Sequence, residues 1–182
     1  MNSRVATAAL VLILGLGVMG ATSSERGFSP YVGADGGIAL PEDFRREFAH
    51  LGSWFVPDGP ASGFHDVYTQ PESIAHYRET GLFPDGAVLV KELRASQSAA
   101  YTTGADVSSA TGEIKQWFVM VKDTKGRFAD NPLWGEGWGW ALYKPDAPQT
   151  NVATDFQKDC IGCHIPAKDT DYVYVDAYPT LK

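Results

Sequence analysis

The sequence predicts a mainly β, α+β protein in which an antiparallel sheet is combined with a few short helices, one of them near the C-terminus. Two observations support this class. Most of the chain alternates apolar and polar residues with a period of two and is dense in aromatic and β-branched residues, which favours strands. Helical periodicity is confined to short stretches. The length of 182 residues, with 44% hydrophobic residues, fits a single domain.

Two short helices are expected in the first half of the chain. The first covers residues 41–51, with Pro41 at its first position and Gly52 after its end. Its inward face would consist of Phe44, Phe48 and Leu51. The second covers residues 71–80 and ends at Gly81, with Ile74 and Tyr77 facing inward.

Strands are expected over residues 64–69, 87–95, 114–122, 137–143 and 172–178. In the fourth of these segments large side chains alternate with small ones. Gly139 and Ala141 lie between Trp138, Trp140 and Leu142. The small residues allow either the close approach of a large group or a bend in the strand.

The first 21 residues resemble a secretory signal peptide. Arg4 provides the positive charge, residues 5–19 are apolar, and small residues at 18–21 offer a cleavage site. An uncleaved anchor is the alternative, although the apolar run is shorter than the roughly 20 residues that span a bilayer. We therefore expect export to the periplasm, no stable membrane insertion after cleavage, a short flexible segment at residues 22–27, and one domain at 28–182. The net charge of −7 argues against a nucleic-acid partner.

The two cysteines of the chain form the sequence Cys160-Ile-Gly-Cys163-His164. This spacing is the attachment motif for haem c, in which two thiols bond to the porphyrin edge and the adjoining imidazole binds the iron. Thr154 or Asp155 is expected to cap a helix that carries both cysteines and Phe156 on one side. A disulfide, a thioredoxin-like redox site, and a zinc site remain as alternatives. The zinc site would take its further ligand from His50, His65 or His76.

The motif lies close to the C-terminus. Small electron-transfer cytochromes instead carry it near the N-terminus, and a methionine later in the chain is their second iron ligand. The one methionine after residue 21, Met120, precedes the motif and is expected in the core. An iron without a second protein ligand is open to small molecules, which favours catalysis or gas binding. An electron-transfer cytochrome with Met120 as a ligand is the less favoured alternative, and the strand-rich pattern argues against a four-helix bundle.

Lys91 is the second residue that stands out, because the pleat places it on the same face as Leu89 and Leu93. Such a lysine either extends to solvent at an exposed edge or points into an apolar pocket. If it is buried, desolvation favours a neutral amine that can act as a nucleophile.

An ordered series of motifs resembles the cytochrome P-460 family, over residues 38–182. These motifs are His65-Asp-Val-Tyr-Thr-Gln-Pro-Glu, Thr80-Gly-Leu-Phe-Pro-Asp-Gly, Val90-Lys91-Glu92-Leu93, Val121-Lys-Asp-Thr-Lys-Gly-Arg-Phe-Ala and the Cys160–His164 motif. The resemblance implies a mainly β homodimer with one covalently bound haem per chain, cross-linked to Lys91. It also implies oxidation of hydroxylamine to nitrous oxide or nitrite at a five-coordinate iron, binding of nitric oxide, and electron transfer to a partner such as a soluble cytochrome.

Two positions depart from the pattern of the family. His65 stands where hydroxylamine-oxidising members carry an arginine, and Phe118 stands where they carry a carboxylate that accepts substrate protons. Glu92 and Glu113 are alternative carboxylates. The related cytochrome c′-beta proteins have an apolar distal side and bind nitric oxide or carbon monoxide. The sequence therefore predicts a hydroxylamine oxidoreductase with His65 and Phe118 beside the haem, and a non-enzymatic gas-binding protein is the alternative.

Overall fold

The computed structural model describes residues 28–182. The expected signal peptide at residues 1–21 and the segment at 22–27 lie outside the described residues. None of the helices in this part of the chain has the length and apolar character needed to span a bilayer.

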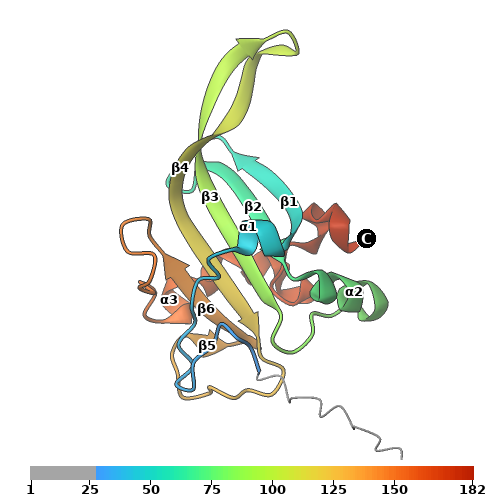
Figure 1. Cartoon of the computed structure of the whole chain (residues 1–182), viewed down its shortest axis with the longest axis vertical. Helices are drawn as coiled ribbons and strands as arrows, with labels where there is room; N and C mark the ends of the chain where they lie inside the picture. The colour runs from blue at the N-terminus through green and yellow to red at the C-terminus, as the bar shows by residue number, and fades with distance from the viewer. Residues whose placement is uncertain (1–27) are drawn as a thin grey trace, which may run out of the picture.

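The core of the fold is one antiparallel sheet of six strands in the order β1-β2-β3-β4-β6-β5 (Figure 1). The strands are β1 (Ala49–Val56), β2 (Gly63–Thr69), β3 (Val88–Tyr101), β4 (Gly104–Lys122), β5 (Trp134–Gly135) and β6 (Trp138–Tyr143). The predicted fold class is confirmed, and four of the five predicted strands correspond to β2, β3, β4 and β6. The strands β1 and β5 were not predicted.

The helices are short. They are α1 (Phe44–Glu47), α2 (Pro71–Thr80) and α3 (Phe156–Asp159), followed by the 3₁₀ turns η1 (Ile161–Cys163), η2 (Ile165–Thr170), η3 (Val175–Ala177) and η4 (Pro179–Leu181). The predicted helix at residues 71–80 is confirmed. Gly81 ends it with a φ of 74°, a left-handed conformation that glycine adopts without strain.

The predicted helix at residues 41–51 is wrong except for the four residues of α1, and β1 already begins at Ala49. Pairing of β1 with β2 outcompetes the helical pattern, and a bulge between His50 and Gly52 shifts the register. As a result, Leu51 packs on the opposite face of the sheet from Phe44 and Phe48.

The predicted strand at residues 172–178 is also wrong. This segment forms the turn η3 and contacts the sheet without pairing to it. Asp171, just before this segment, and Tyr172, its first residue, have left-handed backbone conformations with φ of 59° and 63°, far from the extended conformation of a regular strand. The alternating aromatic residues of this segment pack over one face of the sheet instead.

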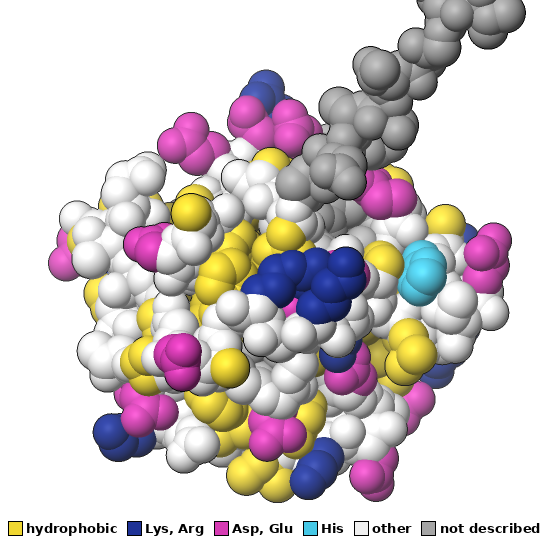
Figure 2. Space-filling model, turned by 90° about the horizontal axis from the view of Figure 1, so that it is seen from below, with side chains coloured by type: hydrophobic (Ala, Val, Ile, Leu, Met, Phe, Trp, Pro, Cys, Tyr) yellow, Lys and Arg dark blue, Asp and Glu magenta, His cyan; other side chains and the backbone are white. Residues whose placement is uncertain are grey.

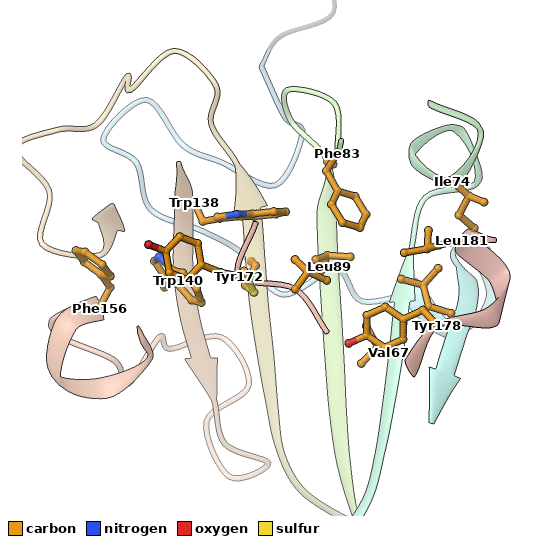
Figure 3. Close-up of a cluster of buried hydrophobic side chains, with 14 residues drawn as sticks. Val67, Ile74, Phe83, Leu89, Trp138, Trp140, Phe156, Tyr172, Tyr178 and Leu181 are labelled. Atoms are coloured by element: carbon orange, nitrogen blue, oxygen red, sulfur yellow. The ribbon is translucent and has the colours of Figure 1, made fainter. Parts of the chain in front are cut away.

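Each face of the sheet carries its own hydrophobic cluster. On one side α1 and the preceding segment cover Val88, Val90 and Val121. On the other side α2, α3 and the C-terminal turns pack against Leu89, Met120, Trp138 and Trp140, as Figure 3 shows for the aromatic members. Trp134 lies against Gly139, where an added Cβ would come within 2.7 Å of the indole ring. The expectation that a small residue there admits a large group is confirmed.

β3 and β4 are longer than predicted and extend beyond the rest of the sheet as a two-stranded hairpin (Figure 1). None of residues 95–113 in this hairpin is buried. Figure 2 shows the opposite end of the molecule, where acidic side chains are scattered among hydrophobic ones. The same face also carries a compact group of basic side chains.

Candidate cofactor site

A cavity of about 490 Å³ lies between the sheet and the C-terminal segment. Cavities of roughly 300–1,000 Å³ accommodate small ligands and cofactors. Its wall is mostly aliphatic and aromatic and is built by β1, β2, β3, β4, β6 and the turns after α3. All six residues predicted for the site line this cavity, namely His65, Lys91, Phe118, Cys160, Cys163 and His164.

The two thiols reach the cavity through a short helix followed by a 3₁₀ turn. Asp155 caps α3, since its side chain accepts a hydrogen bond of 2.9 Å from the Gln157 backbone N–H, and Asp155 is therefore the correct one of the two predicted caps. The helix is shorter than predicted and ends before Cys160, so the turn η1 carries Cys163. Both cysteines are free, and burial raises the pKa of the Cys160 thiol to about 11.

His164 is held in one orientation. Its Nδ1 lies 2.7 Å from the Tyr172 carbonyl oxygen, which requires Nδ1 to donate and leaves Nε2 with a free lone pair. The Trp140 ring packs edge-on at 4.9 Å between ring centroids. Burial lowers the pKa of His164, which favours the neutral imidazole that binds a metal. The residue thus has the tautomer and protonation state of an axial ligand.

Lys91 points from β3 into the cavity and does not lie at an exposed edge. Its Nζ is 4.1 Å from the centroid of the Phe118 ring, which comes from the neighbouring position on β4. Burial lowers the pKa of this amine to about 8, although the nearby Cys163 and Cys160 groups act in the opposite direction. The apolar-pocket interpretation of the sequence is therefore the correct one.

His65 lies on β2, on the same face of the sheet as Lys91, and is 5% exposed. Its Nε2 is 2.8 Å from the Ala61 carbonyl oxygen, while the buried Nδ1 has no hydrogen-bond partner. The ring stacks on Trp54 with 5.4 Å between centroids. Burial lowers the pKa of His65, so a neutral imidazole with its lone pair on Nδ1 is favoured.

Neither alternative carboxylate lines the cavity. Glu92 is buried on the opposite face, where it accepts a hydrogen bond of 2.9 Å from the Trp117 indole and pairs with Arg45. Glu113 is exposed on the hairpin. Among the described residues, Asp159 is the one acidic side chain on the cavity wall, and its Oδ2 accepts hydrogen bonds from residues 154 and 155.

Several wall residues were not predicted as site residues. The most important are Trp54, Tyr172, Tyr174 and Tyr178. The last three belong to the segment predicted as a strand, so the wrong secondary structure concealed their role. Met120 packs in the core as predicted and also contributes to the wall.

His50 and His76 do not line the cavity. His50 contacts Ser53 at 2.9 Å, and His76 is exposed on α2. Within residues 28–182, no group of three or more His, Cys, Asp or Glu side chains is placed to hold a metal ion.

An apolar cavity of this size fits a haem, because two thiols lie on its wall and one oriented imidazole presents a free nitrogen to it. Fold and site together define a haem cytochrome whose pocket is built on a sheet. The sequence model described as Cytochrome P460 matches residues 41–175, more than half of the chain. The chain therefore belongs to the cytochrome P460 family. A search of curated proteins gave no match.

Proposed function

We propose that the protein is an exported mono-haem c-type cytochrome that oxidises hydroxylamine. The observation that carries this proposal is the position of Lys91, which brings a primary amine of lowered pKa into the same cavity as the two thiols and His164. A haem bound there supplies an iron that accepts electrons from a small ligand and passes them on.

Cys160 and Cys163 would hold the haem through thioether bonds, and His164 would be its proximal ligand. The Nδ1 contact to Tyr172 supports this assignment, because it directs the free Nε2 lone pair to the cavity. Lys91 would be the residue joined to the porphyrin edge, with Nζ replacing the hydrogen of an edge C–H group. This substitution releases two protons and two electrons and therefore needs a two-electron oxidant such as a peroxide. With a pKa of about 8, about a tenth of this side chain is the neutral, nucleophilic amine at pH 7.

His65 would accept a proton from the bound substrate. Oxidation of hydroxylamine releases protons as well as electrons, and a general base must therefore be close to the bound molecule. The neutral His65 ring has an unpartnered Nδ1, and the Ala61 carbonyl fixes this tautomer. Phe118 would exclude water from the same side of the cavity.

The second candidate is a non-enzymatic protein that binds nitric oxide or carbon monoxide. It is favoured by Phe118 on the cavity wall and by the engagement of the Asp159 carboxylate with backbone N–H groups. Apolar surroundings suit neutral diatomic gases, which need no proton acceptor.

Steady-state assays distinguish the two functions. The haem-loaded protein is supplied with hydroxylamine and an artificial electron acceptor, and reduction of the acceptor is measured together with nitrous oxide and nitrite. We expect turnover. Tight binding of nitric oxide without any turnover would instead establish the gas-binding function.

The expected export and electron transfer belong to the same proposal. We propose cleavage after residue 21, a periplasmic location, and a soluble cytochrome as the electron acceptor. N-terminal sequencing of the protein purified from the periplasm tests the first two, and an N-terminus at Met1 would contradict them.

A further inference from the structure

We propose that Lys122, Asp171 and Glu136 are positioning residues, which hold the Tyr172 carbonyl against His164 and thereby tune the haem iron. This inference rests on the proposed role of His164 as the proximal ligand. It extends that role to a network of three residues that are distant in the sequence and do not line the cavity.

The network starts at the carbonyl that orients the imidazole. Tyr172 accepts the His164 Nδ1 hydrogen bond at 2.7 Å and is itself fixed at its far end, because its hydroxyl donates to Glu136 Oε2 at 2.6 Å. Tyr172 is 7% exposed and packs in the hydrophobic cluster shown in Figure 3. Its main chain and its side chain are therefore both restrained.

Asp171, the residue before Tyr172, is also anchored through its side chain and its main chain. Its carboxylate accepts a hydrogen bond of 2.7 Å from Lys122 Nζ, and its carbonyl oxygen accepts one of 3.0 Å from the Trp138 indole. The side chain of Lys122 is only 11% exposed, and its Nζ lies 4.8 Å from the centroid of the Trp138 ring. A partly buried ion pair of this kind is less screened than a pair at the surface.

The backbone of the network is strained. Three non-glycine residues in the described part of the chain have positive φ, and they are Glu136 at 57°, Asp171 at 59° and Tyr172 at 63°. Glu136 and Asp171 belong to the network, and Tyr172 carries the carbonyl that the network holds. Non-glycine residues in this region carry a conformational cost and persist where their surroundings hold them. Two successive left-handed residues turn the chain so that the Tyr172 carbonyl faces His164 rather than a neighbouring strand.

A hydrogen bond from Nδ1 to an acceptor increases the electron density that the imidazole donates to a bound metal. A firmly held acceptor therefore stabilises ferric over ferrous iron and lowers the reduction potential. Loosening of the network would lengthen the Nδ1 contact, weaken the iron–histidine bond and raise the potential.

The test uses the haem-loaded protein and the variants Lys122→Met and Asp171→Asn. Lys122→Met removes the ammonium and keeps the apolar stem. Asp171→Asn removes the negative charge, while asparagine still tolerates the left-handed conformation. We expect both variants to lower the iron–histidine stretching frequency of the ferrous protein and to raise its reduction potential. The double variant should shift both quantities no further than a single one, because the two residues form one pair.

Asp85→Asn is the matched control, because it removes a comparable ion pair, that of Asp85 with Arg127, from a position that does not line the cavity. It should leave both quantities unchanged. Glu136→Gln, at an exposed position, provides a second variant if the two partly buried ones do not fold, and it should shift both quantities in the same direction.

The inference is overturned if the variants bind haem and show the frequency and the potential of the unmodified protein, even if they melt at lower temperature. Failure of the proposed ligation has a different signature. In that case the unmodified protein itself shows no iron–histidine band.

Discussion

At the scale of single residues, Lys91 and Glu92 are neighbours on β3 whose side chains leave the sheet on opposite faces. Lys91 enters the cavity, while Glu92 is held by Arg45 and Trp117 on the other side. A slip of one residue in the strand would exchange the two side chains. The buried contacts of Glu92 therefore also fix the face of the sheet on which the Lys91 side chain lies.

We expect Lys91 to be joined to the haem. A tryptic digest should yield its peptide linked to the peptide of Cys160 and Cys163, and the ferrous protein should absorb well to the red of ordinary haem c. The variant Lys91→Met should bind haem and give the ordinary spectrum. Lys115→Met is the control, because Lys115 bonds to the Ser62 carbonyl and does not line the cavity. A free Lys91 peptide from the unmodified protein would refute the cross-link.

We expect His65 to shape the pH dependence of hydroxylamine oxidation. Burial lowers its pKa below the usual value of about 6.5, so the neutral form that accepts protons dominates above that pH and is lost as the pH falls through the lowered pKa. kcat/KM should therefore be level near pH 7 and decline in acid.

The variant His65→Gln tests this assignment. It should reduce kcat/KM by about 10²–10⁴-fold, the usual contribution of a general base, and should abolish the acid decline. His76→Gln, on the exposed surface of α2, should change neither. If kcat/KM of the His65→Gln variant still declines in acid as in the unmodified protein, a group other than His65 causes the decline.

At the scale of elements, prediction succeeded where the signals are local. The helix α2 begins at Pro71 and ends at Gly81, and both signals act through the backbone conformation of the residues themselves. The Cys160–His164 sequence predicted a haem from its spacing alone, and the match to the cytochrome P460 family supports haem binding. No contact with the remainder of the chain is needed to recognise either feature.

Prediction failed where distant contacts decide the structure. Residues 172–178 alternate aromatic and smaller side chains because they cover a cavity, and this pattern matches that of a strand. β1 was missed because its first residues also satisfy a helical pattern, and only the pairing with β2 favours the strand. The network of Lys122, Asp171 and Glu136 has no signal in the sequence. It depends on the left-handed turn at Asp171 and Tyr172, at the start of the segment that was predicted to be a strand.

The contact between β1 and the C-terminal turns depends on Gly52. A Cβ at this position would lie 2.5 Å from the carbonyl oxygen of Ala177, in the segment that closes the cavity. We expect Gly52→Ala to push this segment away, to lower the free energy of unfolding by about 1–3 kcal/mol and to reduce haem retention. Chemical denaturation and haem content measure the two effects.

Gly112→Ala is the matched control for this variant. Nothing lies within 4 Å of a Cβ added at Gly112, so stability and haem content should be unchanged. Equal stability of the two variants would show that the C-terminal segment can move without cost.

At the scale of the whole molecule, the hairpin of residues 95–113 extends beyond the rest of the sheet. An isolated two-stranded hairpin is marginally stable in water, and none of these residues is buried. The segment contains two charged residues, Asp106 and Glu113, in a chain of net charge −7. A surface poor in charge is what two copies of an acidic protein need for close contact. We therefore propose that the expected homodimer uses this hairpin.

The variant Tyr101→Glu places a negative charge at the hairpin tip, where Tyr101 is 55% exposed. In a symmetric dimer the charge enters the interface twice, so we expect the molar mass from light scattering to fall to that of a monomer while haem content stays unchanged. Leu82→Glu, at a residue 59% exposed after α2, is the matched control and should remain dimeric. If the unmodified protein is a monomer, or if Tyr101→Glu remains a dimer, the hairpin is not the interface.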